Sequence, residues 1–301
     1  MHKGIVVKIA LGPIQYYWSR NEVVTFYGKM AESAAQIVYL GETVCSRRHE
    51  LRLPDWLDIA KDLKACGKEV VLSTQTLLEA ESDLKTLRKI AANETFTVEA
   101  NDMGAVHCLQ GQNFVAGPFL NLFSTPSLEL LVKQGAMRWV MPLEMGQAGL
   151  ASILADKQFP VETEVFAYGR LPLAFSARCF TARNRNLPKD NCQYVCMEHP
   201  DGLMMKTRES QPFLVLNGIQ TQSALVYNLL AELDGMRETG VDIVRISPQW
   251  RDTDRIVELY DAVINHRMSV ADAMAQIEPL MPEKGCNGYW HGKPGLEQVA
   301  A

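Results

Sequence analysis

A TIM-like (β/α)8 barrel is the α/β fold that this sequence predicts, and three observations lead to it. Short Val- and Ile-rich runs alternate with longer amphipathic runs, as in β–α units around a parallel sheet. Eight such strand-like runs can be counted, which is the number that closes a barrel of this type. The chain has 301 residues, a length that suits one large barrel or two ordinary domains.

The predicted strands are short runs of β-branched and other apolar residues, and most are separated by helix-like runs with one apolar face. In chain order the strands are 4–10, 35–40, 69–73, 96–99, 113–116, 138–141, 164–168 and 241–246. Helices are predicted at 22–32, 54–66, 77–92, 126–134 and 147–156, and another at 252–266 follows the last strand.

The opening run, MHKGIVVKIALGP, is predicted to be a buried strand and not a signal peptide. Lys8 interrupts its apolar stretch, Gly12 and Pro13 end it, and Tyr16-Tyr17-Trp18 follow where small residues would mark a cleavage site. No apolar stretch reaches the 18 residues of a membrane span. Seven cysteines without a secretory signal favour a reducing compartment, so a cytoplasmic protein is expected.

The segment from 179 to 218 breaks the β–α rhythm. It is polar and rich in turn-forming residues before two strand-like runs, LMM and FLVL, so we interpret it as an insertion after the seventh strand. Residues 1–301 are therefore predicted to form a single barrel domain with this insertion and a loop-like C-terminal tail at 285–301. The net charge of −5 gives no general basic field for nucleic acid.

Three cysteines within the insertion, Cys179, Cys192 and Cys196, predict a site for a metal or a cluster. Grouped thiolates are strong ligands of soft metals, and segments that follow barrel strands build the active-site face. Unpaired cysteines are often merely small buried residues. The residues between these three are polar and turn-forming, however, and offer little apolar surface to fill.

Three ligands do not complete such a site, and four other cysteines could supply the fourth. Cys66 ends a helix before Gly67, Cys108 lies in an apparent helix, and Cys286 lies in the tail. Cys45 directly follows the second strand and so belongs to the same barrel face as Cys179. Cys45 is thus the preferred fourth ligand, although the two loops would have to meet across the barrel mouth.

The residues alone leave the metal open between an iron–sulfur cluster and zinc. Both accept four cysteines, but zinc sites usually contain two tight C-x2–4-C pairs and only one is present here. Nearby cations would offset the negative charge of a buried cluster. The arginines that flank Cys45 and Cys179 are Arg47, Arg48, Arg178, Arg183 and Arg185.

Polar residues at strand ends are further candidates for catalysis, and each could instead be a helix cap. They are Glu99, Asn101, Asp102 and Glu144. No serine nucleophile elbow, phosphate-binding loop or HExxH motif is present.

The segment ETEVFAYGRLPLAFSARC resembles the signature of the collagenase-like peptidase family, E-x-E-x-F-x-H-G-A-L-C followed by G-R-C and C-x3-C. The matching residues are Glu162, Glu164, Phe166, Gly169, Arg178, Cys179, Cys192 and Cys196. The resemblance extends through GPFLN (117–121), PLEM (142–145) and GYWHGKPG, and so covers most of the chain. Three positions depart from the family: Tyr168 replaces His, Arg170 replaces Ala, and Pro172 replaces a Cys. With that cysteine lost, Cys45 is the natural replacement.

The sequence YGRLP, the YYW stretch and LGETVCSRR resemble a branch of this family that acts in ubiquinone biosynthesis. The resemblance implies a 4Fe–4S cluster on Cys45, Cys179, Cys192 and Cys196. It also implies a heterodimer with a UbiU-like protein and anaerobic, oxygen-independent hydroxylation of a prenylated phenol, with prephenate as the oxygen donor. RNA base hydroxylation and a metallopeptidase are the alternatives that other relatives suggest. No nucleophile–base pair for proteolysis is recognisable.

Overall fold

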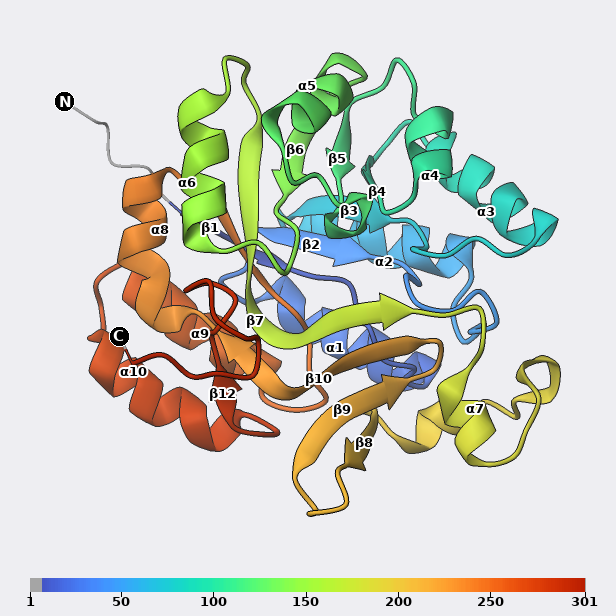
Figure 1. Ribbon diagram of the computed structural model, residues 1–301. Helices are drawn as coiled ribbons and strands as arrows, with labels where there is room; N and C mark the ends of the chain where they lie inside the picture. Colours follow the sequence, from blue (N-terminus) through green and yellow to red (C-terminus); the bar gives the residue numbers. More distant parts are fainter. Residues whose placement is uncertain (1–6, 301) are drawn as a thin grey trace.

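The computed structural model describes residues 7–300 and contains a closed parallel β-barrel with helices outside it (Figure 1). Each barrel strand pairs in parallel with the next, and the last strand pairs with both the first and the seventh. The barrel strands are β1 (Lys8–Leu11), β2 (Ile37–Leu40), β3 (Glu69–Ser73), β4 (Thr97–Ala100), β5 (Phe114–Ala116), β6 (Ala136–Val140), β7 (Glu162–Phe175) and β11 (Ile243–Ile246). The predicted TIM-like barrel is confirmed; residues 4–6 of the first predicted strand lie outside the described residues.

The helices follow the prediction at six places. They are α1 (Arg20–Ala31), α2 (Leu53–Ala65), α3 (Glu81–Ala91), α5 (Thr125–Lys133), α6 (Gln147–Asp156) and α9 (Thr253–Ile264). The apparent helix around Cys108 is α4 (Met103–Cys108). Two further helices, α8 (Leu233–Thr239) and α10 (Val270–Ile277), were not predicted, because each is short and α10 depends on packing against α9. No described helix combines the length and the apolar character needed to cross a bilayer.

Beyond the barrel, the long strand β7 continues into an antiparallel sheet (Figure 1). β10 (Gln220–Asn228) pairs with β7, β9 (Pro212–Asn217) with β10, and β8 (Leu203–Lys206) with β9. The LMM and FLVL runs thus form β8 and β9. The connection from β7 to β8 contains α7 (Phe180–Asn184) and the 3₁₀ turns η2 (Lys189–Asn191) and η3 (Val195–Glu198). The remaining elements are η1 (Pro118–Leu120), η4 (Leu230–Glu232), η5 (Glu278–Leu280) and β12 (Gly285–Cys286), which pairs with β10.

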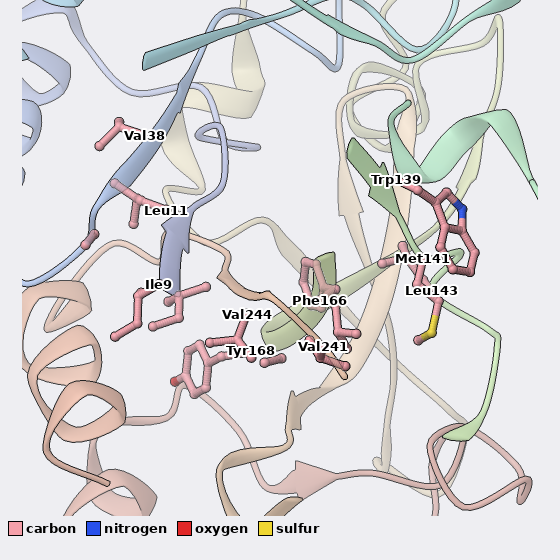
Figure 2. Packing of buried hydrophobic residues seen from close by; sticks show 14 of the residues in the cluster. Ile9, Leu11, Val38, Trp139, Met141, Leu143, Phe166, Tyr168, Val241 and Val244 are labelled. Carbon is pink, nitrogen blue, oxygen red and sulfur yellow. The ribbon is translucent and has the colours of Figure 1, made fainter. Parts of the chain in front are cut away.

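The barrel wall separates two cores, because side chains alternate along each strand. Ile9, Leu11 and Val38 belong to the main apolar cluster between the strands and the helices, parts of which Figure 2 shows. Ala10 and Tyr39 belong to a separate cluster inside the barrel. The barrel interior also contains the buried side chains of Glu99, Glu164 and Arg245.

A glycine after β2 fixes the path of the chain toward the β2–α2 connection. Gly41 has φ +131°, and a Cβ there would lie 2.6 Å from the carbonyl oxygen of Ser73. We expect Gly41→Ala to lower the free energy of unfolding by about 2 kcal/mol, because both backbone strain and overlap result. The exposed helical Gly28 has open space around its Cβ position, and Gly28→Ala should raise that free energy by about 0.5–1 kcal/mol. Urea unfolding followed by circular dichroism measures both; equal effects of the two changes would contradict the expectation.

Candidate metal centre

The four cysteines selected from the sequence, Cys45, Cys179, Cys192 and Cys196, line one pocket, here called the thiol pocket. Its other lining residues are Arg47, Arg48, Lys189, Tyr194, Val195 and Gly218. The β2–α2 connection supplies Cys45, and the connection after β7 supplies the other three. These two loops do meet across the barrel mouth, as the choice of Cys45 required.

Local hydrogen bonds hold Cys45 in place. Glu42 Oε1 accepts from the backbone N–H groups of Val44 at 2.9 Å and Cys45 at 3.0 Å, which closes a tight turn after β2. The Cys45 side chain is 8% exposed and packs with Val44 and Ile219, with Cys179 at the edge of this small apolar cluster. The turn and the cluster together position the thiol at the pocket wall.

Cys179 occupies the N-cap of α7, where its Sγ accepts from the backbone N–H of Ala182 at 3.4 Å. The β9–β10 turn supports this helix start, since the Phe180 N–H donates to the Gly218 carbonyl at 3.1 Å. The Gly218 N–H in turn donates to Thr181 Oγ1 at 2.9 Å. The antiparallel sheet thus fixes the position of Cys179.

Cys192 and Cys196 stand on either side of a reversal in the chain. Gln193 and Tyr194 have φ of 50° and 55°, a left-handed conformation that turns the backbone between η2 and η3. All seven cysteines of the chain are free thiols in the structure. The C-x3-C spacing is therefore folded as a turn that directs two half-buried cysteines to one pocket.

Arg48 brings a buried positive charge to the thiol pocket. Its Nη1 donates to the Gln15 carbonyl and its Nη2 to Asn217 Oδ1, both at 2.7 Å, and Glu42 lies 3.6 Å away. Burial raises the pKa of the Cys45 thiol to about 11, while Arg48 opposes that rise. Burial also raises the pKa of Cys196, again opposed by Arg48. Thiolates bound to a metal here would gain a cation beside them.

The five arginines considered from the sequence divide into two groups. Arg47 lines the pocket with Arg48, and its Nη2 donates to the Asp190 carbonyl at 2.6 Å. The other three side chains lie at the surface, and Arg185 forms an ion pair with Glu198 at 2.6 Å. Lys189 supplies a further cation at the pocket, where it pairs with Glu79. Lys189 was not predicted from the sequence, although its position between Cys179 and Cys192 could have indicated it.

The other three cysteines lie away from the thiol pocket. Cys66 is exposed at the C-cap of α2, as its place before Gly67 indicated. Cys108 packs against the main core from the end of α4. Cys286 is fully buried in that core, beside β10.

The four cysteines of the thiol pocket would bind a metal or a cluster through their sulfur atoms. Within residues 7–300 there is no group of three or more His, Cys, Asp or Glu side chains arranged to hold a single metal ion. A single zinc ion needs its thiolates about 4 Å apart, because each Zn–S bond is about 2.3 Å long. In a four-iron cluster each cysteine binds a different iron atom, so the ligands surround a larger group. The four thiols that line the pocket, with Arg47, Arg48 and Lys189 beside them, are the donors and cations that such a group would use.

The four polar residues at the predicted strand ends lie in different environments. Glu99 and Asn101 are buried at the barrel mouth, where they line a small pocket with Arg245 and Phe119. Asp102 is the N-cap of α4 and accepts from the Gly104 N–H at 2.6 Å. Glu144 is exposed. Only the first two are thus placed to face a ligand inside the barrel.

Three positions that depart from the family signature follow one another along β7. Tyr168 is buried and donates to Gln249 Oε1 at 2.7 Å. Arg170 is also buried and donates to the carbonyls of Ser223 and Ala224 in β10. Pro172 lines the barrel-mouth pocket and not the thiol pocket. In this fold, position 172 thus belongs to the barrel-mouth pocket, whereas Cys45 of the β2–α2 connection lines the thiol pocket.

Comparison with known proteins shows the family. The sequence profile described as peptidase family U32 matches residues 25–300. Among solved structures, the U32 peptidase Mk0906 is 12% identical with a TM-score of 0.46, over 83% of this chain and 95% of that one. The rubisco-like protein MtnW from Alicyclobacillus acidocaldarius is 13% identical with a TM-score of 0.48, over 91% and 65%. N-acetylneuraminate lyase from Fusobacterium nucleatum is 9% identical with a TM-score of 0.39, over 90% and 80%. On the profile match, the resemblance to the collagenase-like peptidases is confirmed, and the chain belongs to peptidase family U32.

Proposed function

We propose that this protein is a UbiV-like, iron–sulfur subunit of an oxygen-independent hydroxylase in anaerobic ubiquinone biosynthesis. It would bind a 4Fe–4S cluster through Cys45, Cys179, Cys192 and Cys196 and act in the cytoplasm with a UbiU-like partner. The substrate would be a prenylated phenol and the oxygen donor prephenate.

The observation that supports this proposal most is the thiol pocket itself. Cysteines from two loops far apart in the sequence line one pocket, and Cys45 supplies a fourth thiol in a chain that has Pro172 where the family signature has Cys. Burial of thiolates is costly unless a metal or a cation compensates it. Arg48 is 4% exposed and lies among these thiols, which gives the charge compensation that a bound cluster needs.

The residues of the chain would hold the cluster and keep water from it. Val195 and the Cys45 side chain are 9% and 8% exposed, so one side of the thiol pocket is closed to solvent. Such a cluster would supply one-electron transfer. Exclusion of water from its sulfurs helps to set the potential at which it does so.

Anaerobic co-purification with a candidate partner tests the proposal. The protein should be brown, contain about four irons and about four sulfides per chain, and give an EPR signal after reduction, as a single 4Fe–4S cluster requires. Colourless protein with one zinc per chain would contradict the cluster. A deletion strain that loses an RNA modification and keeps anaerobic ubiquinone would favour RNA base hydroxylation, and peptide cleavage by cluster-free protein would favour a peptidase.

A further inference from the structure

A network of buried amide side chains connects one wall of the thiol pocket with the barrel mouth. Gln15 belongs to the segment between β1 and α1 and lines the barrel-mouth pocket, Asn217 ends β9, and Gln220 and Gln222 lie on β10. All four are 6% exposed or less. Because buried amides are costly unless they are hydrogen-bonded, their partners show what the network holds in place.

The amide network ends on Arg48. Asn217 Nδ2 donates to the Gln15 carbonyl at 2.8 Å and to Gln220 Oε1 at 3.0 Å. Gln220 Nε2 donates to Gln15 Oε1 at 2.6 Å, and Gln222 Nε2 donates to Gln220 Oε1 at 2.9 Å. The Gln15 carbonyl and Asn217 Oδ1 are also the acceptors for the two terminal nitrogens of Arg48. The network therefore fixes the orientation of this guanidinium.

The surroundings of Arg48 enclose it further. A Cβ at Gly218 would lie 3.0 Å from Arg48 Nη2, so the β9–β10 turn approaches the guanidinium with bare backbone. The ring of Tyr17 lies 5.5 Å from Arg48 Cζ on another side. The Arg48 side chain is only 1% exposed. Its charge is thus weakly screened by water and acts strongly on its neighbours.

One N–H group of Arg48 remains without a partner. Arg48 Nε is buried and donates to no acceptor among the described residues. Buried N–H groups of this kind are rare and costly, so an acceptor is expected to approach this one. Arg48 shares the thiol pocket with the four cysteines, and sulfur atoms of a group bound there would be acceptors.

We propose that Arg48 sets the reduction potential of the group bound in the thiol pocket, and that Asn217 is the positioning residue for Arg48. The presence of a cluster rests on the proposed function, whereas the role of Arg48 is argued from its burial and its hydrogen bonds. Reduction adds one negative charge, so a fixed cation and an N–H group beside the sulfurs favour the reduced state and raise the potential. Glu42, 3.6 Å from Arg48, has the opposite effect.

Redox titration of the anaerobically purified full chain, followed by EPR, tests this. Arg48→Met should lower the midpoint potential by at least about 59 mV, a tenfold change in the equilibrium constant for one electron. Arg48→Lys should recover part of that shift, since it keeps the charge. Asn217→Ala should lower the potential by a smaller amount, because Arg48 loses an acceptor that orients it. Glu42→Gln keeps an oxygen acceptor for the Cys45 N–H and should raise the potential.

Two arginine variants are controls. Arg185→Met removes an exposed cation that pairs with Glu198 and should leave the potential unchanged. Arg47→Met removes a pocket cation whose side chain is 37% exposed, so water screens it and the shift should be less than half of that in Arg48→Met.

Iron content, measured on the same samples, separates this inference from the proposed function. A four-iron cluster with the native potential in both Arg48→Met and Glu42→Gln would overturn the role of Arg48 and leave the proposed function intact. Native protein without iron would overturn both. If Arg48→Met does not fold or loses its iron, Glu42→Gln decides, because it retains Arg48: a raised potential supports the inference and an unchanged one overturns it. A shift in Arg185→Met equal to that in Arg48→Met would also overturn it.

Discussion

Cys45→Ala should reduce the iron content from about four atoms per chain to about three or fewer after anaerobic purification and reconstitution. Cys45 is the only one of the four thiols that comes from the β2–α2 connection, so its loss removes one whole side of the proposed site. A four-iron cluster with three thiolates leaves one iron open to solvent and to loss. Iron and acid-labile sulfide assays, together with the visible absorbance, measure the effect.

Two matched variants separate ligand loss from a general effect of removing a cysteine. Cys66→Ala changes an exposed helix cap, and Cys108→Ala changes a partly buried residue that packs against the main core. Both should retain full iron. Full iron in Cys45→Ala would exclude Cys45 as a ligand, and the same loss in Cys66→Ala would show that the assay reports on something other than the site.

The barrel could be predicted because each of its strands and helices is encoded by a pattern of residues that are neighbours in the sequence. Each strand is a short apolar run and each major helix an amphipathic one, and the bounds of α6 agree with the predicted range of 147–156. The first three thiols were found for the same reason, since Cys179, Cys192 and Cys196 lie within 18 residues. Cys45 was reached by a topological argument, because loops after barrel strands share one face.

What the sequence did not reveal depends on contacts between distant segments. A cavity beside the thiol pocket brings Trp56 of α2 and Ile90 of α3 together with Tyr194 of the connection after β7, and no periodicity along the chain reports such a space. The antiparallel sheet was seen only in part, because β10 continues beyond the predicted end of the insertion. Its pairing with β7 is set by hydrogen bonds between segments about fifty residues apart.

A buried ionic cluster inside the barrel was likewise not predicted. Arg245 lies between two carboxylates, with Nε 2.5 Å from Glu164 Oε1 and Nη2 2.8 Å from Glu99 Oε1. Its guanidinium lies 4.0 Å from the ring centroid of Tyr39, whose hydroxyl donates to Glu164 at 2.6 Å. Burial disfavours the charge on Arg245, but Glu164 and Glu99 together hold its pKa well above the ordinary value. The guanidinium therefore stays charged in the fold and pairs with both carboxylates, while Arg138 Nε, 4.0 Å from Glu164 Oε2, adds a second positive charge.

Arg245→Met should lower the free energy of unfolding by about 3–5 kcal/mol, because it removes the cation that pairs with the buried Glu99 and Glu164. Arg255→Met, which removes an exposed ion pair with Glu258 on α9, should cost less than about 1 kcal/mol. Urea unfolding at pH 7 compares the two. Adding Glu99→Gln and Glu164→Gln to Arg245→Met should restore part of the loss, since uncharged amides are less costly to bury. Equal destabilisation by the two arginine changes would mean that the barrel interior is hydrated enough to screen these charges, and the cluster would then contribute little to stability.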